Sequence, residues 1–491
     1  MPRRTVLAVA VLAALPALAI PFAAVAMSGG LMSGGVERSS ERPPSFTRDV
    51  APIVAAKCAG CHRVGGIAPF ALETASQISS RAAHIAAAVS DGRMPPWPPG
   101  PRSPAYAGER ERTLSARQRA TLVAWARAGG RVDGPARRAR PQRPAPARAG
   151  ETVLDLRMRS AYRPSAPQGV TDDYRCFLLD PKLSRDAMVT SARIVPGRPR
   201  VVHHVILFRV APDQVADAKR LDASSSGPGW TCFGGTGLPL GAGGSIGSAL
   251  DDASWVAAWA PGWGGDRLPN GTGVPLPAGS QIVMQVHYNL LNGREPDRSR
   301  AILTTAPATA GLEPLRTVLL PGPVELACAR GEQGRLCDRN EALFDLVRKY
   351  GPEAGFTPAG LLLLCGKNVA SPRPSAVSTC DRRVQAPTTI HVAAGHMHLL
   401  GAAIRLTLNP GTPHERVLLD IPRWDFHWQN AYALTRPVRA RAGDVLRVTC
   451  RHDVAKRRTD HHGAPRTPRY VLWGEGTTDE MCLGILQVTR G

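Results

Sequence analysis

The pattern of apolar and polar positions divides the chain into two parts with different periodicity. Residues 45–130 carry apolar positions at helical spacing, most clearly in "TLSARQRATLVAWARAGG" (113–130). There Ser115 is a suitable N-cap, and Gly129 stands where a helix commonly ends. The apolar face between them is marked by Leu122, Trp125 and Ala126. This stretch predicts the closing helix of a small all-α domain.

Beyond residue 150 the spacing changes to short apolar runs separated by Gly/Pro turns, which predicts all-β sandwich architecture. The runs are "VVHHVILFRV" (201–210), "GSQIVMQVHYNLL" (279–291), "GAAIRLTLNP" (401–410), "RVLLDIP" (416–422), "GDVLRVTC" (443–450) and "MCLGILQVT" (481–489). One segment differs, because "NEALFDLVRKYG" (340–351) has a helical pattern that ends at Gly351. It is interpreted as a helical insertion.

Length and charge set the next limits. The chain has 491 residues, which predicts about three domains of about 150 residues each. Its formal net charge is +22, but the arginines are scattered except in "RVDGPARRARPQRPAPARAG" (131–150). That stretch is interpreted as an Arg/Pro-rich linker, extended where its prolines concentrate. No basic stripe with interleaved aromatic residues occurs, so we expect no nucleic-acid partner.

The N-terminus predicts export. Arg3 and Arg4 precede an apolar stretch that ends in "AVA" (24–26), so residues 1–26 resemble a cleavable signal peptide. The alternative is that this segment stays uncleaved and anchors the protein in the membrane, with the protein facing the periplasm. We expect a membrane contact only in that case. Exported cysteines are expected to pair. Eight of the ten cysteines lie outside the motif described next, which is consistent with four disulfides of open connectivity.

The motif "KCAGCH" (57–62) predicts one covalently bound haem c. Cys58 and Cys61 have the spacing that attaches the two haem vinyl groups, and His62 follows as an axial ligand of the iron. A thioredoxin-like redox pair is the alternative, but no βαβ pattern surrounds it. The sixth ligand is expected to be Met94, which lies in the proline-rich "DGRMPPWPPG" (91–100), with His84 as the competitor. Residues 45–130 thus resemble a class I cytochrome c.

Histidines interrupt three of the apolar runs after residue 150. His203 and His204 are adjacent, and neighbouring strand side chains point to opposite faces. If both serve one site, the backbone near His203 must bulge or the strand must end there. His287 lies within a second run, and His396 and His398 are two apart, which places both on one strand face.

Clustered neutral imidazoles suit copper or zinc, and a thioether favours Cu(I). Met481, next to Cys482 at the start of the last run, is a candidate thioether ligand. Zinc is the alternative that Met481 disfavours. The other histidines are given no role: His391, His414, His427, His452, His461 and His462.

These motifs occur in an order that resembles the copper type II monooxygenases, the family of peptidylglycine α-hydroxylating monooxygenase and dopamine β-monooxygenase. The ordered motifs are His203-His204 before "VILF", Gln285-Val-His287-Tyr, His396-x-His398 and Glu-Met481-Cys482. The resemblance implies two tandem jelly-roll-like β-sandwich domains, at 151–312 and 313–491, with one copper each and a water-filled cleft between them. It implies that the first domain holds the electron-transferring copper and the second the copper that activates O2.

The ligand sets follow from the same resemblance. The electron-transferring copper would be bound by His203, His204 and His287, and the catalytic copper by His396, His398 and Met481. Cys176 with Cys232, and Cys450 with Cys482, stand where the family pairs cysteines. Cys328, Cys337, Cys365 and Cys380 would pair among themselves in an unassigned pattern.

Two departures bear on the substrate. The peptide-amidating members have an arginine where this chain has Ala394 and a tyrosine where it has Ile485. We therefore do not expect this chain to bind the carboxylate of a peptide. The expected activity is hydroxylation of a C–H bond of a small molecule or peptide with O2. Its electrons would come from a periplasmic donor through the haem to the copper at His203. The alternative is a non-catalytic copper and haem protein for electron transfer or redox sensing.

Overall fold

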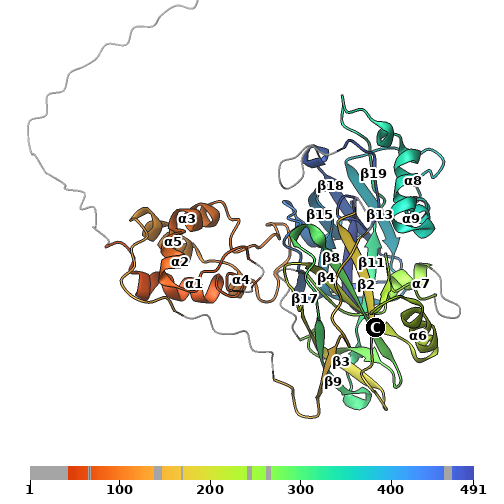
Figure 1. The fold of residues 1–491 in the computed structure, drawn as a ribbon, viewed down its shortest axis with the longest axis horizontal. Coiled ribbons are helices and arrows are strands. Elements are labelled where there is room, and N and C mark those ends of the chain that lie inside the picture. The colour runs from red at the N-terminus through yellow and green to blue at the C-terminus, as the bar shows by residue number, and fades with distance from the viewer. Residues whose placement is uncertain are drawn as a thin grey trace, which may run out of the picture. The chain divides into compact units, whose positions relative to one another are not determined.

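The computed structural model describes residues 42–64, 66, 68–137, 146–166, 170–239, 246–260, 267–457 and 467–491. Most of these residues form β-sheets, with fewer in helices (Figure 1). The predicted signal segment 1–26 and residues 138–145 of the predicted linker lie outside the described residues. No helix within the described ranges is both long and apolar enough to span a membrane.

Residues 46–127 are helical and share a hydrophobic core of their own. A π-helical turn at Phe46–Val50 leads into the helices α1 (Ala51–Lys57), α2 (Ala75–Ser79), α3 (Ala82–Ser90), α4 (Glu109–Arg112) and α5 (Ala116–Arg127). The helix predicted from the last segment is confirmed as α5. Ser115 caps it by accepting from Gln118 N, while the Gln118 side chain reaches back to Ser115 N. Leu122 and Trp125 are buried, and Gly129 adopts the left-handed φ of 92° that ends the helix.

The next part consists of two five-stranded sheets whose buried faces share one core, an arrangement consistent with a β-sandwich (Figure 1). One sheet has the order β1-β9-β3-β7-β10 and the other β5-β2-β8-β4-β6. The strands are β1 (Thr152–Arg157), β2 (Asp172–Leu179), β3 (Ala187–Val195), β4 (Val202–Val210), β5 (Trp230–Thr231), β6 (Trp255–Trp259), β7 (Thr272–Leu276), β8 (Gln281–Asn289), β9 (Arg300–Pro307) and β10 (Glu313–Pro314). Two helices accompany them, α6 (Val215–Ser224) and α7 (Ile246–Asp251). We call this part the N-terminal sandwich.

The rest forms a second pair of sheets around another core, here called the C-terminal sandwich. The four-stranded sheets have the orders β11-β20-β14-β17 and β13-β18-β15-β16, and β12 pairs with β19. The strands are β11 (Arg316–Pro321), β12 (Glu325–Leu326), β13 (Val377–Arg383), β14 (Thr388–His396), β15 (Gly401–Leu408), β16 (Arg416–Ile421), β17 (Ala431–Ala440), β18 (Val445–His452), β19 (Val471–Leu472) and β20 (Leu483–Arg490).

The predicted helical insertion is confirmed and is longer than expected. The helix α8 (Arg339–Tyr350) ends at Gly351 and is followed by α9 (Pro352–Leu364). The two helices pack together beside the C-terminal sandwich (Figure 1). The second helix escaped the sequence pattern because it is apolar nearly all round and contains Pro358, so it has no clear periodicity.

Four disulfides are present, as the eight cysteines indicated. Two are the pairs that the resemblance implied, Cys176–Cys232 and Cys450–Cys482. The open connectivity is resolved as Cys328–Cys337 and Cys365–Cys380. These four bridges fit an exported protein.

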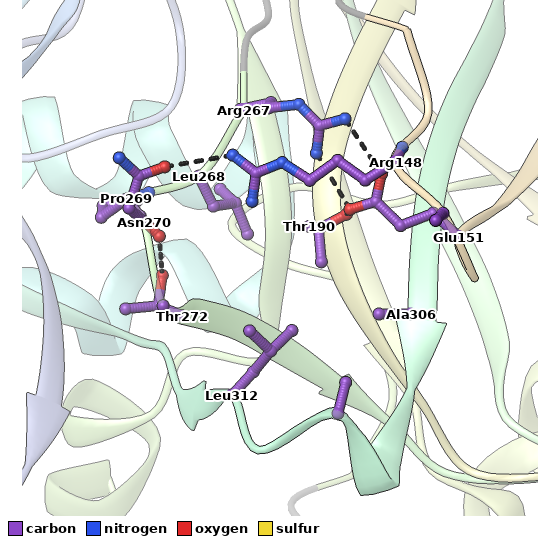
Figure 2. A pocket seen from close by; sticks show the side chains of 13 residues that line it. Arg148, Glu151, Thr190, Arg267, Leu268, Pro269, Asn270, Thr272, Ala306 and Leu312 are labelled. Carbon is purple, nitrogen blue, oxygen red and sulfur yellow. Dashed lines mark hydrogen bonds and ion pairs between the residues drawn. The ribbon is translucent and has the colours of Figure 1, made fainter.

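A small cavity of about 170 Å³ lies where the chain enters the N-terminal sandwich (Figure 2). Glu151 accepts from Arg267 Nη1 at 2.9 Å and from Thr190 Oγ1 at 2.8 Å. Arg148 Nη2 donates to Asn270 Oδ1 at 3.3 Å. These charged and polar groups are already paired with one another. We therefore interpret the hydrogen bonds around the cavity as holding the start of the N-terminal sandwich in place.

Candidate metal centres and their shared cavity

The adjacent histidines lie on a β-bulge. In the pairing of β4 with β8, Val202 is opposite Tyr288 and His204 is opposite His287, so His203 is the extra residue. The bulge turns both rings to one side, with His203 Nδ1 at 3.3 Å from His204 Nδ1. The departure from regular strand that the sequence required is therefore confirmed. His287 Nδ1 completes the group at 3.2 Å from His204 Nδ1.

These three histidines form a group able to hold one metal ion, with ligand atoms within 4.8 Å of one another. Burial lowers the pKa of His203 and of His204 well below the usual value, and His287 adds to the effect in each case. Both rings are therefore neutral at physiological pH. Neutral imidazole is the form that binds Cu or Zn.

Asp172, on β2, orients His287. The His287 Nε2–H group donates to Asp172 Oδ1 at 2.8 Å, which leaves His287 Nδ1 unprotonated toward His204. Burial acts to raise the pKa of Asp172, but hydrogen bonds from His287 and Thr477 outweigh it and lower the pKa to about 2. Tyr174, two residues along β2, stacks on His287 with ring centroids 4.1 Å apart. No sequence motif indicated Asp172 or Tyr174.

The second set of candidate ligands lies where β14 ends and β20 begins. His396 is the last residue of β14, and His398 follows the strand, with ring centroids 5.1 Å apart. Met481 precedes β20 and lines a cavity together with His396. Glu480 joins the two segments, because its carboxylate accepts from His398 N at 2.5 Å, Leu400 N at 2.9 Å and Met481 N at 3.2 Å.

Hydrogen bonds select the opposite ring nitrogen in this set. Gln429 Nε2 donates to Phe426 O, so its Oε1 faces His396 and accepts from Nδ1–H at 2.6 Å. His398 Nδ1 lies 3.3 Å from Asp479 O, a carbonyl that can only accept. Both rings therefore leave Nε2 free for a ligand. Burial lowers the pKa of His396 to about 4 and that of His398 to about 3.

The two sets lie next to each other in this structure, whereas the resemblance implied a water-filled cleft between the two domains. His204 and His396 have ring centroids 6.0 Å apart. Phe426 of the C-terminal sandwich stacks on His203 at 4.7 Å. The sandwiches are held in contact because Tyr174 donates to Glu475 O at 2.8 Å and Thr477 hydrogen-bonds to Asp172.

A cavity of about 560 Å³ opens beside the two sets and is lined by residues of both sandwiches. His204, His396 and Met481 all contribute to its wall. Ala394 and Ile485, the two positions at which this chain departs from the amidating enzymes, also line it and are opposite each other in β14 and β20. The two departures from the amidating enzymes therefore change side chains on the wall of this cavity.

The residues predicted to hold haem fit that group by their chemistry. Cys58 and Cys61 are free thiols, whereas the other eight cysteines form disulfides. His62 is buried and its Nδ1 lies 3.1 Å from Phe70 O, which leaves Nε2 free as an axial ligand. Met94 is 42% exposed, and His84 lies on the exposed side of α3.

The histidines without a predicted role are scattered. His391 Nε2 lies 3.0 Å from Thr489 Oγ1, His414 and His427 are exposed, and His452 is buried in β18. His461 and His462 lie outside the described residues. None of the described four joins either set.

The decisive comparison concerns the C-terminal sandwich. Residues 373–487 match the family model "Copper type II ascorbate-dependent monooxygenase, C-terminal domain". The matched segment includes His396, His398 and Met481. It supports the monooxygenase family that the motifs resemble, and with it a copper-dependent monooxygenase activity in general.

The other comparisons add little to the monooxygenase match. The chain has no match among curated proteins. A Paenibacillus xanthan lyase is 9% identical over 72% of this chain and 27% of its own, with a TM-score of 0.16. Allantoicase is 10% identical over 66% and 90%, with a TM-score of 0.15. Procruciferin, an 11S globulin from Brassica napus, is 11% identical over 69% and 85%, with a TM-score of 0.14. The chain thus spans about a quarter of the xanthan lyase.

Proposed function

We propose that this protein is an exported, copper-dependent monooxygenase that hydroxylates a C–H bond with O2. One oxygen atom enters the substrate and the other is reduced to water, which consumes two electrons and two protons. The observation that carries the proposal is the pair of oriented ligand sets facing one cavity. The match of residues 373–487 supports it independently.

The two sets would hold two copper ions with different tasks. Copper bound at these sets would supply one-electron storage at one site and O2 activation at the other. His203, His204 and His287 would bind the first ion, and Asp172 keeps His287 in the required tautomer. His396, His398 and Met481 would bind the second, and the thioether of Met481 favours the reduced state there. A substrate bound in the cavity would lie next to His396 and Met481, which line its wall.

Electron supply is proposed to come from a covalently bound haem in a cytochrome c-like domain over residues 45–130. Cys58 and Cys61 would attach the haem, and His62 and Met94 would bind its iron. A bound haem supplies single electrons, which is how copper accepts them. The donor to the haem would be periplasmic, in keeping with the haem motif and the four disulfides.

Metal analysis and O2 consumption by the full-length chain test this proposal. We expect two copper ions per chain and substrate-dependent O2 consumption with copper and a reductant, both impaired in His396→Ala. If the chain binds two copper ions but hydroxylates no member of a substrate panel, the non-catalytic electron-transfer alternative holds instead. If zinc is bound after copper and zinc are offered together, the metal assignment is wrong.

A further inference from the structure

The cavity beside His396 and Met481 offers no cationic group to a ligand. Among the described residues that line it there is no lysine or arginine, although the whole chain contains 61 of them. Glu475 supplies the one carboxylate of these lining residues. Away from any copper bound at the two sets, a ligand carboxylate or phosphate would be desolvated there without a partner of opposite charge, which is unfavourable.

The wall is instead built from aromatic and aliphatic side chains of both sandwiches. Trp255 and Trp259 come from β6 of the N-terminal sandwich, and Trp473 comes from the C-terminal sandwich. Ala394 and Ile485 form the adjacent part of the wall near His396. The volume of about 560 Å³ suits one small organic molecule, since such sites commonly measure about 300–1,000 Å³.

The helix α9 provides the outer wall. Phe356 lines the cavity but is 75% exposed, so it stands at the mouth. Leu361 lines it from within and is 8% exposed, whereas Leu363 is 73% exposed and is not part of the wall. The disulfide Cys365–Cys380 ties the end of this helix to β13.

We propose that this cavity is the substrate site and that the substrate is an uncharged, largely apolar molecule that enters past Phe356. The inference rests on the proposed function, because it takes the C–H bond held beside His396 and Met481 to be the one hydroxylated.

Binding of three probes with one skeleton tests the charge preference. The probes are 1-adamantanemethanol, 1-adamantanecarboxylate and 1-adamantanemethylamine, titrated into the oxidised, copper-loaded full-length protein without reductant. Binding is followed by the fluorescence of Trp255, Trp259 and Trp473. We expect the alcohol to bind at least about tenfold more tightly than the carboxylate, the equivalent of about 1.4 kcal/mol. Tighter binding of the carboxylate, or of the amine through Glu475, would overturn the proposal.

Two variants with a control test the location. Gly360 lines the cavity, and a Cβ built on it meets no atom within 4 Å, so a larger side chain can start from this position without a clash at its Cβ. We expect this variant to weaken binding of the alcohol by about 100-fold, and Phe356→Ala by about tenfold, which corresponds to one aromatic contact. Leu363→Phe, on the same helix but outside the wall, should bind as the wild type does. Unchanged binding in Gly360→Phe would place the ligand elsewhere and overturn the proposal.

This binding assay needs no turnover, so it separates the two proposals. If the alcohol binds as expected but no hydroxylated product forms from any neutral substrate, the proposed function fails while the cavity assignment stands. If hydroxylation occurs only with a charged substrate, the proposed function stands and the cavity assignment fails.

A separate observation concerns the loop that follows Met94. Ala107 N donates to Ala433 O at 2.8 Å, Thr435 N donates to Ala105 O at 3.1 Å, and Tyr106 Oη donates to Leu418 O at 2.8 Å. The loop therefore docks on β16 and β17 of the C-terminal sandwich. None of these three hydrogen bonds reaches β4 or β8, the strands that carry His203, His204 and His287.

Aromatic rings bridge this junction. Trp97, three residues after Met94, meets Tyr432 of β17 edge-on at 5.4 Å, and Tyr106 lies 5.2 Å from Tyr432. Tyr432 is buried and pairs with Ala393 of β14, the strand that ends at His396. Gln429, three residues before Tyr432, is hydrogen-bonded to His396.

We infer that Trp97 and Tyr432 are positioning residues for electron entry at the His396 side. This inference rests on the proposed function: a bound haem would give up one electron and be left ferric, and a copper bound by His396, His398 and Met481 would take it up, changing from Cu(II) to Cu(I). Anaerobic stopped-flow reoxidation of the haem, with both metals bound and no substrate, measures this step without turnover. We expect Trp97→Leu and Tyr432→Leu to slow it about tenfold, equivalent to about 1.4 kcal/mol in the barrier, and Trp97→Phe and Tyr432→Phe to retain most of the rate.

Arg102→Ala, an exposed change in the same loop, serves as the control with an unchanged rate. The route through Trp97 would be overturned by two results together. The rate of haem reoxidation would be unchanged in Trp97→Leu, and reoxidation would be lost in His203→Ala but not in His396→Ala. Electrons would then enter at the set that contains His203. No reoxidation in the wild type would overturn the haem relay itself.

Discussion

The two histidine sets use the same side chain in opposite ways. At His203, His204 and His287 a bulge inside a sheet gathers three Nδ1 atoms, and Asp172 occupies Nε2 of His287. At His396 and His398 the strand has ended, Gln429 and a backbone carbonyl occupy Nδ1, and Nε2 is left free. In the first set His287 is buried, while His204 lines the same cavity as His396. The second sits on a cavity wall with a thioether beside it, which suits a site that must admit O2 and substrate.

Removing one ligand from each set tests whether the sets are independent, and it should give the largest effects. His287→Ala and His396→Ala should each lower copper affinity at their own set by more than about 100-fold, since even the loss of an outer-shell partner costs about 10–100-fold. Each variant should keep one copper per chain, as measured by metal analysis after dialysis. Loss of both ions in either variant would mean that the sets form one shared centre.

Asp172 hydrogen-bonds both to His287 of the first set and to Thr477 of the C-terminal sandwich. Asp172→Asn should weaken copper binding at the first set by about 10–100-fold, because His287 loses its orienting carboxylate. Competition against a copper chelator measures the affinity.

The matched control for this change is Asp173→Asn. Asp173 is the next residue on β2 and bonds to Tyr162 and Ser165 instead. An equal loss in both variants would show that Asp172 acts through general stability of the strand.

Gln429 is the corresponding orienting group of the second set. Gln429→Leu should lower copper affinity at the second set by about tenfold. This is the low end of the loss expected when a residue that orients a ligand is removed, because an amide is a weaker acceptor than a carboxylate. Gln429→Glu should retain the affinity. The copper signal of the first set, read by electron paramagnetic resonance, should stay unchanged in both variants.

Phe426 contacts one ring of each set, His203 at 4.7 Å and His398 at 6.2 Å between ring centroids, and its replacement should give the smallest effect. Loss of its stacking on His203 in Phe426→Leu should cost about 0.5–1.5 kcal/mol, a few-fold change in copper affinity at the first set. Chelator competition detects this difference. Arg423→Ala, an exposed change in the same loop, should have no effect, and an equal shift in both variants would contradict the contact.

Local patterns in the sequence predicted many parts of the structure. The helix capped by Ser115 and the strands that carry His203, His287 and His396 follow from periodicity, because burial of one apolar face decides these elements locally. For the two adjacent histidines the sequence left two possibilities: their side chains lie on opposite faces of a regular strand, or a bulge brings them together. The structure contains the bulge. The apolar helix α9 was missed, because a helix without a polar face has no period to detect.

The sequence by itself determined the candidate ligand residues, the cysteine pairs that a resemblance could supply, and those strands and helices that have a clear periodicity. The tertiary structure alone decided which ring nitrogen each histidine presents, because Asp172 and Gln429 lie 115 and 33 residues away from the rings they orient. It also brought the two sets into contact and formed beside them a cavity that no lysine or arginine among the described residues lines. Those features depend on how two sandwiches pack, and packing between distant segments leaves no periodic trace along the chain.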